Sequence, residues 1–307
     1  MAELPKPLVS VLMPAFNHEA YVEAAVRSVM RQTYPNVELV AIDDGSTDET
    51  PVILDRLSKE LDFTFFRNEQ NIGINATLER AMEQSRGDYL SILASDDLIL
   101  PGKIARQVEH AQAHGFDAVY ANGFLLSPEG RQVPINLEEA RRHHASGTLL
   151  QLAYCDDTKL PLLQSGLFRR EAMLALAPYR REFQSDDWVI LIKLLERYRV
   201  SFLDERLFLY RQHAANSYRR CWQTLPMRID VIARVTPASL RARAMATILA
   251  SHARALREEG QKPMARRFWL ASLAFDGSPA RAIYWARNRL AAAILKLAQL
   301  ANQNVQP

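Results

Sequence analysis

The sequence predicts an α/β protein with a mostly parallel sheet flanked by helices, followed by an α-helical appendage. Two observations predict the sheet: short apolar runs alternate with helical patterns over residues 8–93, and loops of turn-forming residues separate them. A third predicts the appendage, because an Ala- and Arg-rich pattern of helical period follows residue 237. Repeated strand–helix alternation implies right-handed crossovers between parallel strands. The 307 residues, 48% of them hydrophobic, suffice for one large core.

Apolar runs rich in branched residues mark the expected strands, and apolar positions three and four apart mark the helices between them. The first run, residues 8–13, stops at Pro14, as a buried parallel strand does. The other expected strands are residues 37–42, 63–67, 89–93, 118–122 and 201–203, and the expected helices are residues 19–32, 49–61, 74–85 and 186–198.

The C-terminal part differs from the rest of the chain in charge. Residues 1–218 contain 23 Lys and Arg against 31 Asp and Glu, a net charge of −8, whereas residues 219–307 contain 15 against 4, a net charge of +11. Breaks at residues 260–263 and 276–279 divide this region into three expected helices arranged as hairpins. We therefore expect a catalytic domain over residues 1–218 and a basic helical region over residues 219–307.

The basic region indicates a negatively charged partner. Basic tails meet nucleic acid, anionic lipid or an acidic protein, although a solvated helical surface rich in Arg has the same composition. Trp269, Tyr284 and Trp285 stand among its arginines, a mixture that suits an anionic membrane surface or, equally, burial between helical hairpins. We expect no nucleic-acid partner, because no recognised motif supports one.

Cysteine usage and the N-terminus indicate the compartment. Cys155 and Cys221 have neither a C-x-x-C spacing nor a nearby His cluster, which argues against a disulfide framework or a zinc site and favours a reducing cytoplasm. Residues 1–7 lack the basic-then-apolar pattern of a secretory signal, and no run approaches the roughly eighteen apolar residues of a membrane span. We expect a cytoplasmic protein, soluble or peripheral on the inner membrane.

Two acidic loops follow expected strands. Residues 43–46 (DDGS) come after the second strand and residues 95–97 (SDD) after the fourth. In open α/β sheets, ligands bind beyond the carboxyl ends of the strands, so the two loops predict one site. Taken alone, residues 43–48 fit equally well a turn that caps the next helix.

Several motifs occur in the order found in one enzyme family. The sequence reads VSVLMPAFN at residues 9–17, SVMRQTY at 28–34 and DDGSTD at 43–48. It continues with NIG at 71–73, GDY at 87–89, SDD at 95–97, DDW at 186–188 and YRQH at 210–213. Over about residues 8–215 the chain therefore resembles the family 2 glycosyltransferases, which have the Rossmann-like GT-A fold. The resemblance implies an inverting, metal-dependent transfer of a sugar from a dTDP- or UDP-linked donor to a saccharide or lipid-linked saccharide acceptor.

The resemblance places the donor nucleotide between the loops that follow the first strands. A nucleotide sugar presents a base, a ribose and a diphosphate, which need backbone edges, carboxylates and positive charge. Asp44 is expected to accept a hydrogen bond from the imide of uracil or thymine. The residues implied for nucleotide binding are Pro14, Ala15, Phe16, Asn17, Asp43, Asp44, Asn71, Gly73 and Ser95.

A diphosphate beside carboxylates requires a cation, because like charges repel strongly at close range. Mg²⁺ or Mn²⁺ accepts oxygen ligands from both groups, and the resemblance assigns this ion to Asp96, Asp97 and His213. The commonest family pattern is Asp-x-Asp, and this chain departs from it with Ala94 at the first acidic position. His213 fits an exposed loop histidine equally well.

An inverting transfer needs a base that takes the proton of the acceptor hydroxyl. The resemblance assigns this role to Asp187, although adjacent carboxylates at a helix start also serve as caps. The residues implied for acceptor binding are Ser165, Asp186, Trp188 and Arg211.

Two other functions fit parts of the sequence. A nucleotidyltransferase also combines a parallel sheet with acidic metal ligands, but it would carry a glycine-rich basic loop where this chain has residues 14–17. A non-enzymatic carbohydrate- or membrane-binding scaffold would place its function in the basic helices. Residues 92–97 (ILASDD) resemble bacterial members that build surface polysaccharide, including rhamnosyltransferases of lipopolysaccharide, and we expect a role of that kind.

Overall fold

The structure is a computed structural model of the chain and describes residues 6–155, 161–183, 187–213 and 221–275. It contains two compact units. The first is Met1–Arg142 with Leu160–His213, and the second is His143–Lys159 with Ala214–Pro307. The chain therefore enters the second unit briefly before residue 160 and returns to the first, so each unit is built from two stretches of sequence.

The first unit is organised around one sheet. Its described strands are β1 (Val9–Ala15), β2 (Val37–Asp43), β3 (Thr64–Arg67), β4 (Tyr89–Ile92), β5 (Leu98–Ile99), β6 (Ala118–Leu126), β7 (Gln132–Ile135), β8 (Gly166–Arg169) and β9 (Val200–Arg211). They lie in the order β3-β2-β1-β4-β8-β6-β9-β5, with β7 paired to β6. The expected α/β class is confirmed.

The parallel block β3-β2-β1-β4 positions the site. β1 lies between β2 and β4, and its last residues Pro14 and Ala15 pair with Ile42 and Asp43. Because neighbouring parallel strands end at the same edge, the loops that follow β1 and β2 start side by side. These strands lie where uninterrupted apolar runs predicted them. Such runs mark strands that are buried on both faces, and β1 is buried throughout apart from the partly exposed Pro14.

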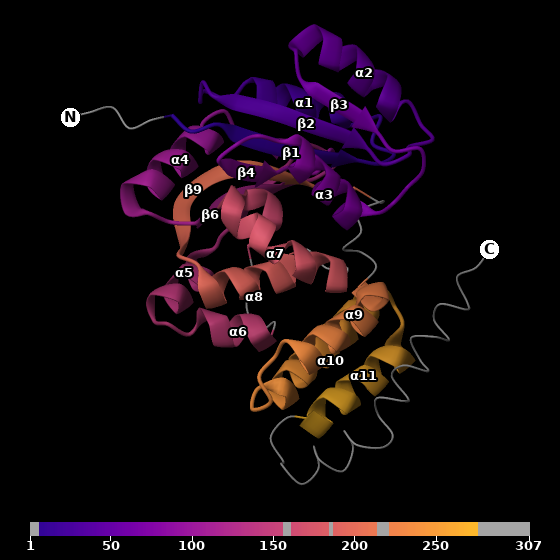
Figure 1. Ribbon diagram of the computed structural model, residues 1–307. Helices are drawn as coiled ribbons and strands as arrows, with labels where there is room; N and C mark the ends of the chain where they lie inside the picture. The colour runs from indigo at the N-terminus through magenta and orange to yellow at the C-terminus, as the bar shows by residue number, and fades with distance from the viewer. Residues whose placement is uncertain (1–5, 156–160, 184–186, 214–220, 276–307) are drawn as a thin grey trace. The chain divides into compact units, whose positions relative to one another are not determined.

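Helices flank the sheet of the first unit. They are α1 (Val22–Met30), α2 (Thr50–Leu61), α3 (Ile74–Gln84), α4 (Lys103–His114), α5 (Glu138–Ala145), α7 (Arg170–Phe183) and α8 (Asp187–Arg197). Figure 1 shows α2 over one face of the parallel strands and α3 beneath the other. Each buries its apolar stripe, as with Val22, Ala25, Val26 and Val29 of α1.

The far half of the sheet is mixed rather than parallel. β8 runs antiparallel to both β4 and β6, whereas β6 and β9 are parallel to each other. β9 spans twelve residues, although the sequence predicted only residues 201–203. The cause is the polar stretch Asp204–Arg206, which breaks the apolar pattern where the β6–β9 register shifts between Ala121 and Gly123.

The second unit is helical. Its elements are α6 (Leu149–Cys155), α9 (Cys221–Arg234), α10 (Arg241–Glu258) and α11 (Lys262–Phe275). The expected break near residue 260 is confirmed: Gly260 has a φ of 80°, and Gln261 N–H donates to Leu256 O at 2.8 Å. α9 was not predicted, because Pro226 inside it argues against a helix. The third expected helix, beyond residue 279, lies outside the described residues.

No helix among the described residues is both long and apolar enough to traverse a bilayer.

Candidate active site

The loops that follow β1 and β2 are tied together by hydrogen bonds. Asn17 N–H donates to Ser46 Oγ at 2.9 Å, and Thr47 N–H donates to Asn17 Oδ1 at 2.9 Å. Asn17 has a φ of 54°, a left-handed conformation that Asn tolerates better than most residues. Asn17 therefore shapes the loop with its side chain, while the neighbouring Phe16 leaves 41% of its surface exposed.

Asp44 organises a third loop. Its carboxylate accepts hydrogen bonds from Asn68 Nδ2 at 2.8 Å and from the N–H groups of Ile72 at 2.9 Å and Gly73 at 3.0 Å. Gly45 permits this approach, because a Cβ there would lie 2.5 Å from the carbonyl carbon of Gln70. The loop of residues 68–73 is thereby held against the end of β2, and the predicted residues Asn71 and Gly73 lie in it.

Asp43, at the last position of β2, is fully buried. Its Oδ2 atom accepts from Ser46 N–H at 3.1 Å and lies 3.2 Å from Arg67 Nε. Its Oδ1 atom has no hydrogen-bond partner within the described part of the chain. A buried carboxylate oxygen without a donor is unusual and is a candidate acceptor for a ligand group.

Three side chains from different parts of the chain converge on one point. Asp96 follows β4, His213 follows β9 and His18 lies in the loop after β1. His213 Nε2 lies 2.9 Å from Asp96 Oδ2, and His18 Nε2 lies 3.8 Å from the same oxygen. One ligand atom from each residue falls within 4.8 Å of the other two, a spacing that can hold a metal ion. We call His18, Asp96 and His213 the His-Asp cluster.

Neighbouring groups orient the two imidazoles. Ser95 Oγ lies 2.8 Å from His18 Nδ1, which leaves Nε2 of that ring toward Asp96. Tyr21 stacks on His213 with ring centroids 4.8 Å apart, and the Arg211 guanidinium lies 5.1 Å from the centre of the Tyr21 ring. Such outer contacts fix the ring orientation of histidines that bind metals.

Burial sets the charge of His18. Desolvation lowers the pKa of His18, and this effect outweighs the opposing attraction of Asp96. The imidazole is therefore neutral over a wider range of pH than an ordinary histidine, and neutral imidazole is the form that binds metals. The cluster suits a divalent cation, with one carboxylate oxygen and two ring nitrogens as donors.

Asp97 is not among the three residues of the cluster, and its assignment as a metal ligand stays a prediction. Its Oδ1 accepts from Arg211 N–H at 2.8 Å and its Oδ2 accepts from Gln164 Nε2 at 3.1 Å. Burial, followed by the charge of Asp96, raises the pKa of Asp97 well above its usual range. Asp97 therefore connects the loop of residues 95–97 to β9 and to the turn before β8.

Two predicted acceptor residues lie in the interior, and their role in acceptor binding stays a prediction. Ser165 is fully buried and its hydroxyl donates to Leu162 O at 2.6 Å. Trp188, in the first turn of α8, is 5% exposed and packs in the core. Neither side chain reaches a surface where a saccharide could lie. Asp186 lies outside the described residues.

Arg211 and Asp187, by contrast, are both partly exposed. Arg211 Nε donates to Asp96 O at 2.8 Å, so this residue borders the His-Asp cluster. Asp187 is the first residue of α8 and lies near Tyr120 of β6. Burial, followed by the negative charge of Asp187, raises the pKa of the Tyr120 hydroxyl. Tyr120 lies opposite Gly166 of β8, the strand between β4 and β6. The catalytic role of Asp187 remains a prediction.

His18 was missed by the sequence analysis. The signal that could have found it is its position directly after residues 14–17, at the end of the first strand. Its partners Asp96 and His213 are far away along the chain, so local spacing gives no indication of a shared ligand set. The sheet brings them together: β1 lies beside β4, which joins the loops of His18 and Asp96, and β9 pairs with β5, directly after the Asp96 loop, which adds His213.

Comparison with known proteins gives the family. The family described as glycosyl transferase family 2 matches residues 10–176, which is more than half of the chain. The chain belongs to the family 2 glycosyltransferases. The matched residues include most of β1, Asp44, Asp96 and β8, so most of the described site lies within the match, whereas His213 lies beyond it.

Individual relatives of this glycosyltransferase chain are distant. It is 27% identical over 214 residues to the uncharacterized glycosyltransferase EpsJ of Bacillus subtilis, covering 67% of this chain and 62% of the relative. It is 29% identical over 126 residues to the GalNAc(5)-diNAcBac-PP-undecaprenol β-1,3-glucosyltransferase of Campylobacter jejuni, covering 40% of each. Over the first curated relatives, the chain spans only about half to three-fifths of their length.

A solved structure shows the same fold. The mannosyltransferase PcManGT from Pyrobaculum calidifontis, in complex with GDP-Man and Mn²⁺, superposes with a TM-score of 0.61 at 21% identity, covering 96% of this chain and 81% of that one. The GT-A fold expected from the sequence is therefore confirmed for this glycosyltransferase chain.

Proposed function

We propose that the chain is a metal-dependent, inverting glycosyltransferase that moves a sugar from a nucleotide-sugar donor to a saccharide acceptor. The observation that carries this proposal is the His-Asp cluster at the carboxyl edge of β1 and β4. The loop of residues 68–73, which Asp44 holds, lies at the end of the neighbouring strand β2. In an α/β sheet this edge is where ligands bind, and it here combines three possible metal ligands with the loops that follow β1 and β2.

The donor set of the cluster fits a divalent cation and indicates which one. His18 and His213 offer nitrogen and Asp96 offers oxygen, leaving the remaining coordination positions for donor oxygens and water. Mg²⁺ prefers an all-oxygen shell, whereas Mn²⁺, although the weakest binder of the first-row transition ions, belongs to a series that also accepts imidazole nitrogen. We therefore propose Mn²⁺ over Mg²⁺. Bound there, the cation would neutralise the donor diphosphate and stabilise the departing nucleoside diphosphate.

The protein residues divide the remaining work. The loop of residues 68–73, held by Asp44, and the exposed ring of Phe16 form the proposed nucleoside wall. Arg211 supplies positive charge beside the cluster. We propose a dTDP- or UDP-linked donor from the family resemblance. Since PcManGT was solved with GDP-Man, the base has to be tested across all three nucleotides.

Asp187 is the proposed general base. As the acceptor oxygen forms its bond to the anomeric carbon, the bond from that carbon to the diphosphate oxygen breaks on the opposite side, and the hydroxyl proton passes to the carboxylate. This displacement inverts the configuration of the sugar. Asp187 lies at the start of α8 with part of its surface exposed, so an acceptor hydroxyl could reach its carboxylate.

The acceptor and the cellular location are the least constrained parts of the proposal. The Campylobacter jejuni relative is named for a polyprenyl diphosphate-linked glycan acceptor, which supports a saccharide or lipid-linked saccharide acceptor here and a role in bacterial surface polysaccharide synthesis, with a rhamnosyltransferase as one form. We propose that the protein works in the cytoplasm, peripheral on the inner membrane, with the basic helices toward anionic lipid.

Donor binding can be tested by thermal shift. UDP-, dTDP- and GDP-sugars are added with Mn²⁺, with Mg²⁺ or with chelator, because a ligand that binds only the native state raises its stability. A shift for one nucleotide class that requires Mn²⁺ and disappears in Asp96→Asn supports the proposal. Asp55→Asn, an exposed carboxylate on α2, is the matched control and should retain the shift. No shift with any donor well above typical affinities would refute the transferase proposal and favour a non-enzymatic scaffold.

A further inference from the structure

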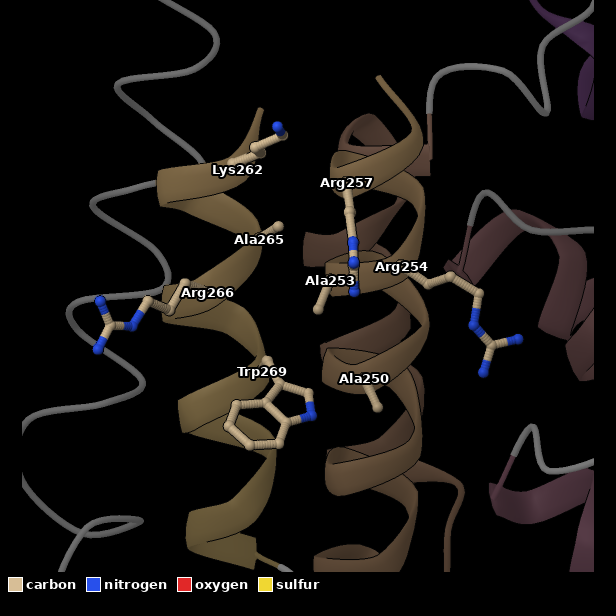
Figure 2. Close-up of a pocket in the computed structure, with 8 residues that line it drawn as sticks. All are labelled: Ala250, Ala253, Arg254, Arg257, Lys262, Ala265, Arg266 and Trp269. Atoms are coloured by element: carbon tan, nitrogen blue, oxygen red, sulfur yellow. The ribbon is translucent and has the colours of Figure 1, made fainter. Parts of the chain in front are cut away.

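The second unit contains a groove that the proposed reaction does not use. It lies between α10 and α11 and has a volume of about 660 Å³. Figure 2 shows Arg257 and Trp269 turned into the gap between the helices and Lys262 above it, while Arg254 and Arg266 extend along its outer sides. The lining residues are Ala250, Ala253, Arg254, Arg257, Lys262, Ala265, Arg266 and Trp269.

The positive charge of this groove is not compensated within the described residues. Four of its eight lining residues are cations and none is acidic. None of the four forms an ion pair with a described acid, whereas Arg234 on the nearby α9 pairs with Asp230. Over residues 241–275 there are seven Lys and Arg against two Glu, a net charge of +5. A groove of this composition is complementary to an anion.

Apolar side chains adjoin the cations on α11. The inner face of this helix is buried, with Phe268 stacked on His252 of α10 at a centroid distance of 6.4 Å. Trp269, at the groove, leaves 53% of its surface exposed, and Leu270 and Leu273 on the same helix leave 50% and 47% exposed. Large apolar side chains beside Lys and Arg are typical of helices that lie in a membrane interface.

We propose that this groove docks the protein on an anionic lipid bilayer. Arg257 and Lys262 would donate hydrogen bonds to the phosphate diester of a headgroup. Arg254 and Arg266 would add positive charge on the outer sides of the groove. Trp269, Leu270 and Leu273 would enter the boundary between headgroups and acyl chains. A nucleic acid would satisfy the cations but would offer no apolar phase for the two leucines, so the combination favours lipid. The inference rests on the proposed peripheral location and assigns it a site.

Flotation of the full chain with vesicles tests the groove. The vesicles contain phosphatidylcholine alone or with an equal part of phosphatidylglycerol. We expect binding only to the anionic vesicles, lost at high salt. Arg257→Gln/Lys262→Gln should weaken the partition about 30-fold, since each basic residue at such a surface contributes about fivefold. The control Arg31→Gln/Arg131→Gln removes the same charge from exposed positions of the first unit and should bind like wild type.

Three outcomes would refute membrane docking at the groove. The first is that the protein does not bind anionic vesicles, and the second is that the groove and control variants weaken binding equally. The third is that the groove variant still binds vesicles but no longer binds single-stranded DNA. A large fall in Tm for Trp269→Ser without vesicle binding would mean that this face packs against the chain itself. Donor-induced thermal shifts measured on the same proteins separate the two proposals. Thermal shifts without any vesicle binding would refute membrane docking at the groove. Vesicle binding without a thermal shift would refute the proposed transferase function.

Discussion

At the scale of single residues, His18 has the most distinctive role. It is the group that converts an Asp–His pair into a three-ligand set, because Asp97 is committed to Arg211 and Gln164. His18→Ala should therefore lower metal-dependent transfer about 100-fold at limiting Mn²⁺ and shift the Mn²⁺ requirement upward, with partial recovery at high Mn²⁺. A Mn²⁺ titration of activity measures this. His114→Ala, an exposed histidine on α4, is the control, and equal effects of both substitutions would contradict the assignment.

Ser95 acts on the metal through His18. Removing its hydroxyl frees Nδ1 of the ring, so Ser95→Ala should weaken Mn²⁺ affinity by about 10-fold, whereas Ser95→Thr, which keeps the hydroxyl, should stay near wild type. The Mn²⁺ dissociation constant, followed by the thermal shift of the nucleotide complex, provides the test. A Ser95→Ala variant with unchanged Mn²⁺ affinity would show that this contact does not orient the ligand.

The residues also show what a sequence can predict about a site. Asp96 and His213 were found through the family motifs. The motif could not tell Asp96 from Asp97, since adjacent side chains in a loop diverge and only the fold decides which of them joins the cluster. The burial of Ser165 and Trp188 could not be predicted from their motif positions either, because burial depends on packing from distant elements.

At the scale of secondary-structure elements, α4 contains a buried cation. Lys103, its first residue, is fully buried and its Nζ donates to Ser91 Oγ at 2.9 Å and Gly166 O at 3.0 Å. Burial alone lowers the pKa of Lys103 to about 7. The lysine thus joins α4 to β4 and to the start of β8, at the place where the sheet changes from parallel to antiparallel.

This lysine predicts a pH dependence of stability. Between pH 7 and 10.5 the unfolded chain holds a proton that the folded chain has lost, so the free energy of unfolding gains roughly 1.4 kcal/mol per pH unit from this group as pH rises. Denaturant melts of wild type and Lys103→Met across this range isolate the contribution. The stability of the variant relative to wild type should fall as pH rises, and a constant difference would contradict the burial of a titrating lysine.

The elements differ in how well their sequence predicts them. The four parallel strands are short apolar runs that need no tertiary information, and they appear within one or two residues of their expected bounds. β9 and α9 were missed because a polar stretch and Pro226 break their patterns, and both are stabilised by neighbours. For β9 and α9, packing against neighbouring elements outweighs the local propensity of the sequence.

At the scale of the whole molecule, the chain passes between two units. α6 belongs to the second unit, where Thr236 Oγ1 donates to Tyr154 O at 3.2 Å and α10 packs against α6. The predicted boundary at residue 218 would therefore cut α6 off from the helices that cover it. Cys155, buried at the end of α6, should become reactive in a chain of residues 1–218.

Thiol labelling tests this prediction. In the 1–218 chain Cys155 is the only cysteine, and it should react with a thiol reagent at least about 10-fold faster than in full-length Cys221→Ser, because the covering helices are gone. Equal slow labelling in both proteins would show that residues 1–218 bury α6 without the C-terminal helices, as an independent domain would.

The central claim is that Mn²⁺ binds through two imidazoles and one carboxylate with the donor diphosphate beside it. Pulsed electron paramagnetic resonance of the Mn²⁺ and nucleoside diphosphate complex measures this most directly, because it detects nitrogen and phosphorus nuclei bound near the ion. We expect coupling to two imidazole nitrogens and to phosphorus, with one nitrogen coupling lost in His18→Gln and the other in His213→Gln. Mn²⁺ coupled to phosphorus alone, with spectra unchanged in both variants, would contradict it.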